Sequence, residues 1–410
     1  MKKLLLATVF LFIAASTTMV AQTYPGCDGD RFRSDVFAEV QATNDIQFGE
    51  GVTIAGNTQQ LFLDVYEPMD DELEARPVVM LAFGGSFITG ERQDLEALCV
   101  AYARQGYVAV TIDYRLYDLP LIPFPTADEM REVVVKALSD YKAAIRFMRE
   151  DAATDNQFRI DPDQFFIGGV SAGAIAAAHT AVMQESDDID DFLLGLIEDN
   201  GGFEGNSSDN TEYSSEVQGF ISMSGALNDA SWIDENDPPF VSVHEDMDIT
   251  VPYGSGFAQV LGVNIVYLEG GREMQLRADS IGVTNELRTI ENSFEHVGYF
   301  DTPEEFASTI NFTTSFVHDQ ICGELTNVQD ITPALQAVQV FPNPTTELIQ
   351  MRNPEGLPLQ VRLLDANGRL IKEAINTNEL PVVDQAAGLY YLEVVDLRNQ
   401  QRNVLEVVIQ

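Results

Sequence analysis

Short apolar runs alternate with amphipathic stretches through the middle of this 410-residue chain. The apolar runs are of the buried type, and we predict strands at residues 61–66, 78–82, 108–113, 164–168, 217–223, 240–244 and 285–290. The amphipathic stretches predict helices at residues 130–150, 171–183, 272–281 and 303–320. This alternation predicts an α/β fold, with a mainly parallel sheet and helices on both of its faces.

The pattern changes after residue 322. Residues 323–336 are predicted to be a linker, and short alternating runs follow it. We predict strands at residues 338–341, 348–351, 359–364, 370–373, 389–395 and 404–409, with a turn at 365–368. Residues 337–410 therefore predict a small all-β sandwich, below the usual size of a domain.

One stretch of the α/β region fits neither pattern. Residues 185–215 are rich in Asp, Gly, Asn and Ser, with an apolar patch at 192–197. The stretch could cap a site or could be a long surface insertion, and the sequence leaves both open.

Charge and the N-terminal end narrow the possible partners. The net charge is −42, from 65 acidic and 23 basic residues, which disfavours nucleic acid and anionic membrane surfaces as binding partners.

The N-terminal end has the pattern of a secretory signal. Lys2 and Lys3 precede an apolar run at 4–15, and mostly small residues follow. We predict a signal peptide at 1–21, because the run is too short for stable membrane insertion.

The chain has three cysteines. Cys99 lies in an apolar helical stretch at 95–103 and is predicted to be a buried free thiol. Cys27 and Cys322 flank the predicted α/β domain, at 22–322. Because export favours disulfides, we expect the two to pair; two independent thiols are the alternative.

The most informative motif is Gly-Val-Ser-Ala-Gly at 169–173. It follows the apolar run 165–167 and opens a helix of small residues. This strand–turn–helix context is the one that a G-x-S-x-G nucleophile elbow requires. Ser171 is therefore the candidate nucleophile, and an ordinary Gly/Ser turn is the alternative.

A serine nucleophile needs a base and an acid that orients the base. In an elbow protein the acid comes first along the chain and the histidine second. Asp248 lies in the loop after strand 240–244 and is the candidate acid, with Asp246 as runner-up. A solvated acidic loop is the alternative for either.

The chain contains only four histidines. His296 lies in a loop after the last predicted strand of the sheet and is the candidate general base, with a plain loop histidine as the alternative. His179, His244 and His318 lie in predicted helices or strands, where we expect them to pack or cap.

Backbone N–H groups must stabilise the oxyanion. Ala172, directly after the nucleophile, should supply one. Others should come from Phe-Gly-Gly-Ser-Phe at 83–87, the loop after strand 78–82, where paired glycines allow close backbone approach; a simple glycine turn is the alternative.

Together these motifs resemble the α/β-hydrolase superfamily, and within it the carboxylesterase and lipase group. The loop 83–87 is similar to that group's HGGGF-type loop, and further similar segments lie at 113–116, 160–162 and 244–252. The resemblance implies that Gly85, Ser86 and Ala172 provide the oxyanion hole. Phe83 replaces a common histidine and Ser86 a common glycine, which leaves the subfamily open.

The tail resembles the C-terminal sorting domain of the type IX secretion system of Bacteroidota. The matching segments are Val-Phe-Pro-Asn-Pro at 340–344, Asp-Ala-Asn-Gly-Arg at 365–369 and Ala-Gly-Leu-Tyr-Tyr at 387–391. The resemblance implies passage through the periplasm to the cell surface or medium, with the type IX machinery as partner. A carbohydrate-binding or adhesive module is the alternative.

The sequence as a whole predicts a secreted serine hydrolase of carboxylic esters. We expect no cofactor and no metal, because neither a CxxC nor an HExxH pattern is present. A serine peptidase of the prolyl oligopeptidase type and a non-catalytic surface adhesion protein are the alternatives. The ester substrate stays open among polysaccharide acyl groups, lipids and polyesters.

Overall fold

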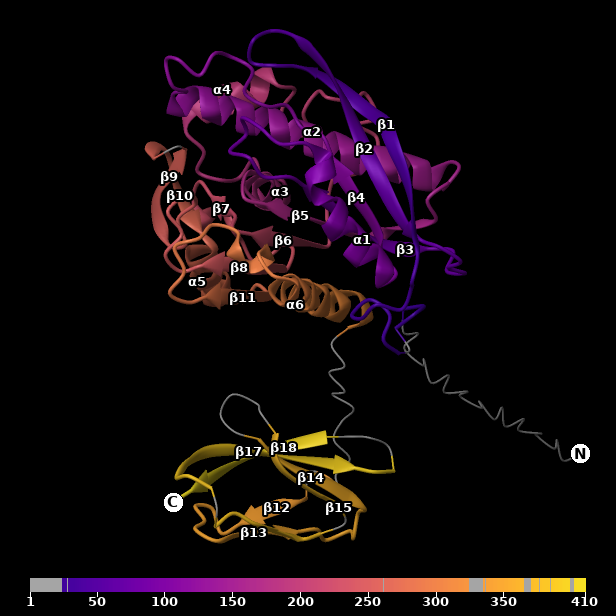
Figure 1. The fold of residues 1–410 in the computed structure, drawn as a ribbon, viewed down its shortest axis with the longest axis vertical. Coiled ribbons are helices and arrows are strands. Elements are labelled where there is room, and N and C mark those ends of the chain that lie inside the picture. The colour runs from indigo at the N-terminus through magenta and orange to yellow at the C-terminus, as the bar shows by residue number, and fades with distance from the viewer. Residues whose placement is uncertain are drawn as a thin grey trace, which may run out of the picture. The chain divides into compact units, whose positions relative to one another are not determined.

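A computed structural model describes residues 24–27, 29–260, 262–323, 335, 337–364, 370–375, 377–383, 385–398 and 402–410. The predicted signal peptide at 1–21, most of the predicted linker at 323–336 and the predicted turn at 365–368 lie outside these residues. Contacts divide the chain after Cys322 into two compact units (Figure 1). The first is called the hydrolase unit below, and the second the tail unit.

An eight-stranded sheet forms the centre of the hydrolase unit, in the order β1-β2-β4-β3-β5-β6-β8-β11. Its strands are β1 (Val40–Val52), β2 (Thr58–Pro68), β3 (Arg76–Ala82), β4 (Val108–Ile112), β5 (Ile160–Val170), β6 (Gly219–Met223), β8 (Phe240–Glu245) and β11 (Asn285–Ile290). The pairs β1–β2 and β2–β4 are antiparallel, and every pair from β4 to β11 is parallel. The predicted mainly parallel sheet is confirmed.

Helices cover both faces of this sheet. They are α1 (Glu96–Arg104), α2 (Ala127–Ala153), α3 (Ala172–Val182), α4 (Asp191–Asp199), α5 (Gly271–Ile281) and α6 (Pro303–Cys322), with short 3-10 turns η1 (Arg92–Leu95), η2 (Ala230–Trp232) and η3 (Gly298–Phe300). Helices α1 and α6 pack together on one face, and α2 and α3 on the other (Figure 1). Helix α2 begins at a capping box, in which Thr126 and Glu129 each bind the other's backbone N–H.

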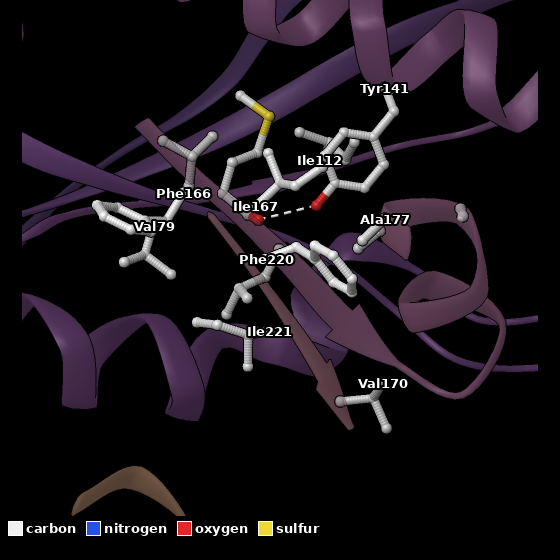
Figure 2. Close-up of a cluster of buried hydrophobic side chains, with 14 of the residues drawn as sticks. Val79, Ile112, Tyr141, Phe166, Ile167, Val170, Ala177, Phe220 and Ile221 are labelled. Atoms are coloured by element: carbon white, nitrogen blue, oxygen red, sulfur yellow. Dashed lines mark hydrogen bonds between the residues drawn. The ribbon is translucent and has the colours of Figure 1, made fainter. Parts of the chain in front are cut away.

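Burial on both faces explains why the central strands are apolar throughout. On β5, Ile167 points toward Tyr141 of α2, whereas its neighbour Phe166 points to the opposite face, near Val79 (Figure 2). All four side chains are at most 1% exposed. The hydroxyl of Tyr141 reaches the sheet and donates to the carbonyl of Met80 at 2.8 Å (Figure 2). This contact ties α2 to the strands that carry the motifs.

A small second sheet was not predicted. Strands β7 (Ala226–Leu227), β10 (Val263–Gly270) and β9 (Ser255–Val260) form it, with β9 and β10 as an antiparallel hairpin. Strand β1 was also not predicted, because most of its side chains are exposed and polar, so that it lacks the apolar signal of its neighbours.

The cysteines behave as predicted. Cys27 and Cys322 form a disulfide that spans 295 residues, and Cys99 is free and buried in α1. None of the helices in the described part of the chain is both long and apolar enough to cross a membrane.

The tail unit is a β-sandwich, as predicted. One antiparallel sheet contains β12 (Gln339–Phe341), β13 (Leu348–Arg352) and β16 (Glu379–Pro381); the other contains β15 (Leu370–Ile375), β14 (Leu359–Leu364), β17 (Gly388–Asp396) and β18 (Arg402–Ile409). Both sheets contribute to one apolar core, for example through Ile349 of β13, Val361 of β14 and Leu392 of β17.

Candidate active site

Ser171 lies at a sharp turn between β5 and α3. Its backbone is in the left-handed region, with φ 54°, which is uncommon for a residue with a side chain. A Cβ added at Gly169 or Gly173 would collide with the carbonyl of Ala82. The two flanking glycines are therefore required for the turn to pack against β3, and the turn holds Ser171 at the carboxyl end of β5.

The three predicted side chains meet in one hydrogen-bonded chain. Nε2 of His296 lies 2.7 Å from Oγ of Ser171, and Nδ1 of His296 lies 2.6 Å from Oδ2 of Asp248. Ser171 follows β5, Asp248 follows β8 and His296 follows β11, all of them parallel strands of one sheet. Because the carboxyl ends of parallel strands share one edge, residues more than a hundred positions apart come together there.

Asp248 is held as a carboxylate that fixes the imidazole. Its Oδ1 accepts the N–H groups of Thr250 at 2.7 Å and Val251 at 3.1 Å, which leaves Oδ2 for His296. Burial alone would raise the pKa of Asp248, but hydrogen bonds from His244 and His296 lower it below its ordinary value. An ionised Asp248 accepts a hydrogen bond from the Nδ1–H group of the imidazole, so Nε2 is free to accept the proton of Ser171.

The runner-up acid is engaged elsewhere. Oδ1 of Asp246 accepts the N–H of Ser293 at 3.2 Å, and its own N–H donates to the carbonyl of Ile290. These contacts tie the loop after β8 to the loop that leads to His296.

The other three histidines pack, as expected, but one of them also touches the acid. Nδ1 of His179 donates to the carbonyl of Ile175, and burial lowers the pKa of His179 to about 4, so it is neutral. His318 pairs with Asp319 on α6. His244 binds the carbonyl of Val251 through Nε2, which also lies 3.4 Å from Oδ2 of Asp248. The contact of His244 with the acid was not predicted.

The loop after β3 lies directly against the nucleophile. A Cβ added at Gly84 would lie 3.2 Å from Cβ of Ser171, so the loop backbone approaches Ser171 closely. Gly85, Ser86 and Phe87 have successive φ angles of 123°, 57° and 58°. Consecutive N–H groups in turns of this kind can form a concave anion-binding site.

The N–H groups that sequence reasoning assigned to the oxyanion are free to bind one. In the described part of the chain, the N–H groups of Gly85, Ser86 and Ala172 donate to no backbone carbonyl. Ala172 is the first residue of α3, where N–H groups lack partners within the helix and the helix dipole favours negative charge.

An apolar cavity of about 90 Å³ opens beside Ser171. Its walls come from α2, α3, α4 and the β9–β10 hairpin, and they include Val134, Leu138, Ile175, Leu193, Val260 and Leu268. Leu193 belongs to the stretch 185–215, so part of that stretch borders the cavity. Other residues of the stretch, among them Asn206 and Ser208, line a separate cavity with β1.

Sequence reasoning missed a polar group behind His296. Glu245 and Ser224, at the ends of β8 and β6, contact the backbone of the His296 loop. Glu245 offered a signal, since a carboxylate directly extends an apolar strand. Ser224 offered none, because its positive φ of 53° is visible only in the structure.

Among the residues that the structure describes, no cluster of His, Cys, Asp or Glu is arranged to hold a metal ion.

The chain is similar to known esterases over part of its length. Residues 63–228 match the BD-FAE family of α/β-hydrolase esterases. Carboxylesterase 1C of Rattus norvegicus is 30% identical over 158 residues, and Gut esterase 1 of Caenorhabditis briggsae is 30% identical over 131 residues. These alignments cover 38% and 32% of this chain, and only 27% and 22% of the two relatives, so the chain spans about a quarter of their length.

Solved structures of esterases align with about 70% of this chain. A truncated carbohydrate esterase from gut microbiota is 18% identical, with a TM-score of 0.48, over 70% of this chain and 98% of the other. Esterase 2 of Thermogutta terrifontis, phosphoramylated by tabun, is 20% identical, with a TM-score of 0.49, over 71% of this chain and 97% of the other.

The tail unit has a match of its own. Residues 339–410 match the secretion system C-terminal sorting domain, which indicates secretion or display at the cell surface. The chain thus matches a family of α/β-hydrolase esterases over residues 63–228 and the type IX secretion sorting domain over residues 339–410.

Proposed function

We propose that this protein is a secreted serine hydrolase of carboxylic esters. The observation that carries the proposal is the continuous hydrogen-bonded chain from Ser171 through His296 to the buried Asp248. Its order and tautomer are those that activate a serine hydroxyl. The match to an esterase family and the similarity to carboxylesterases support the same reading.

The proposed reaction has two acyl-transfer steps. Oγ of Ser171 attacks the ester carbonyl carbon while Nε2 of His296 takes the hydroxyl proton, and Asp248 stabilises the imidazolium. The N–H groups of Gly85, Ser86 and Ala172 bind the oxyanion that forms. His296 then gives its proton to the leaving alcohol, and a water molecule that His296 deprotonates releases the acid from Ser171.

The cavity beside Ser171 suggests which esters bind. Its wall is almost entirely apolar, and its volume of about 90 Å³ is smaller than the roughly 150 Å³ of a cavity that accommodates benzene. We therefore propose esters with a short apolar acyl group. A second, open cavity shares Ser86 and Thr250 with the first and provides room for the alcohol.

A series of p-nitrophenyl esters with acyl chains of increasing length tests this proposal. Each methylene that enters the cavity is worth about 0.8 kcal/mol, so kcat/KM should rise about fourfold per carbon until the cavity is full, and then level off or fall. Ser171→Ala should lower kcat by about 10⁴–10⁶ in a protein that still folds. Cleavage of peptides but not of esters would refute the proposal, as would a folded Ser171→Ala variant that keeps most of its activity.

The tail unit is proposed to route the enzyme rather than to act on substrate. Every residue of the proposed mechanism lies in the hydrolase unit, before the boundary at Cys322. The sorting-domain match supports passage through the periplasm and recognition by the type IX machinery.

A further inference from the structure

Side chains from two central strands hold the backbone on both sides of His296. Glu245, the last residue of β8, is completely buried, and its Oε1 accepts the N–H of Gly298 at 2.7 Å. Ser224 directly follows β6, and its Oγ donates to the carbonyl of His296 at 2.6 Å. The loop of the proposed base is therefore bound to the sheet at two points separated by only two residues.

The backbone of Ser224 is strained in the same way as that of Ser171. Their φ angles are 53° and 54°, and they follow the adjacent parallel strands β6 and β5. The N–H of Ser171 donates to the carbonyl of Met223, and that of Ser224 donates to the carbonyl of Val243. Strained non-glycine residues persist where the surrounding structure fixes them, and they gather at functional sites.

The protons around Ser224 can be assigned. Its Oγ has three neighbours: the carbonyl of His296, the hydroxyl of Tyr299 at 2.8 Å and Oε2 of Glu245 at 3.4 Å. A carbonyl only accepts, so the single hydroxyl proton of Ser224 goes to His296, and Tyr299 donates to Ser224. The contact of Ser224 with Oε2 of Glu245 is the longest of the three.

The surroundings of Glu245 shift the pKa of its carboxyl upward. Burial raises the pKa of Glu245 above its ordinary value, and the nearby charge of Asp248 acts in the same direction, although the N–H of Gly298 and the neighbouring His244 oppose the shift. Glutamine has the same shape and no charge. Its amide oxygen can accept a hydrogen bond from the N–H of Gly298 while its amide nitrogen donates one to Oγ of Ser224.

We propose that Glu245 is a positioning residue that, together with Ser224, keeps Nε2 of His296 within reach of Ser171, and that it acts through hydrogen bonds rather than through charge. The inference rests on the proposed ester hydrolysis. Neither Glu245 nor Ser224 lines the apolar cavity. Their loss should therefore lower turnover per active site and leave substrate binding unchanged.

The test compares Glu245→Ala and Glu245→Gln in the full chain, with p-nitrophenyl butyrate as substrate. Titration with a fluorophosphonate counts the reactive serines, so kcat refers to assembled sites only. A displacement of about 1 Å can cost about 100-fold in rate, so Glu245→Ala should lower kcat up to about 100-fold, with KM within about threefold of wild type. Glu245→Gln should restore kcat to within about fivefold of wild type.

Asp237 offers a matched control. It is also buried, and like Glu245 it accepts a backbone N–H, from Asp234 at 2.8 Å; the side chain of Gln184 donates to it at the same distance. Asp237→Ala should lower the Tm but leave kcat per titrated site unchanged. This comparison separates a positioning role of Glu245 from a general loss of stability.

Each outcome decides the proposal. A wild-type kcat per site in Glu245→Ala refutes the positioning role, and a Glu245→Gln variant as slow as Glu245→Ala shows that the charge is needed. If Glu245→Ala does not fold, Ser224→Ala removes the bond to His296 and must show the same kcat loss at unchanged KM. A wild-type enzyme that neither cleaves esters nor reacts with fluorophosphonate refutes the proposed function instead.

Discussion

Replacing Asp248 by asparagine separates the proposed mechanism from the fold. In Asp248→Asn the amide oxygen can keep the N–H groups of Thr250 and Val251, so the loop after β8 retains its shape. The amide nitrogen then takes the place of Oδ2 and points a hydrogen at Nδ1 of His296. The imidazole must therefore carry its proton on Nε2, where it faces Oγ of Ser171 as a donor and cannot act as base.

The expected loss follows from this wrong tautomer. A substitution of this kind in serine proteases lowers kcat by about 10⁴, which corresponds to about 5 kcal/mol of transition-state stabilisation. KM should stay within about threefold of wild type, because Asp248 does not line the apolar cavity. Steady-state hydrolysis of p-nitrophenyl butyrate measures both constants, and thermal unfolding shows whether the variant folds.

Asp246→Asn is the matched control, because it makes the same chemical change two residues away. Asp246 accepts a backbone N–H from Ser293, which an amide oxygen can also do. Its kcat should stay within about threefold of wild type, as expected of a substitution away from the reacting groups. The reasoning fails if Asp248→Asn keeps more than a tenth of the wild-type kcat, or if Asp246→Asn loses as much as Asp248→Asn.

Three further predictions concern His179, the disulfide and the tail. His179 has a pKa of about 4 in the folded protein against 6.5 ordinarily, so the unfolded chain binds the proton first. The contribution of His179 to the free energy of unfolding should therefore decrease by about 3 kcal/mol from pH 7 to pH 4, and denaturant titrations should show a weaker dependence on pH in His179→Gln. Cys27→Ser with Cys322→Ser should lower the free energy of unfolding by about 2–5 kcal/mol, and an unchanged denaturation midpoint would refute this. A chain that ends at Cys322 should keep the kcat of the full chain but stay inside a type IX-competent host; its appearance in the medium would disprove the sorting role.

Two kinds of sequence signal predicted most of the fold and the candidate site. Strands such as β3 and β8 are buried along their whole length, so most of their positions are apolar. Ser171 and Asp248 follow buried strands, and His296 follows the half-buried strand β11; the order of an elbow protein placed the acid and then the base after Ser171. The elbow glycines added a local signal, because only glycine fits beside β3.

The features that were missed depend on contacts between distant segments. Strand β1 is held by pairing with β2 on one side, so its exposed residues show no apolar pattern. The β9–β10 hairpin buries one face only partly, which weakens its alternation. Glu245 looked like the start of an acidic loop, because its partners Gly298 and Ser224 lie 53 and 21 positions away. Their proximity exists only after the parallel sheet has formed.

The disulfide between Cys27 and Cys322 has a consequence for the resistance of the chain to peptidases. With Cα atoms 5.6 Å apart, it joins the turn at residues 24–27 to the last residue of α6. The disulfide closes residues 27–322 into a covalent ring. Cleavage of one peptide bond in any surface loop of this ring opens it but does not release a fragment. Ends that are tied down in this way also resist the fraying from which proteolysis starts. A nicked molecule can therefore keep its strands, and with them the edge of the sheet that carries Ser171, in one piece.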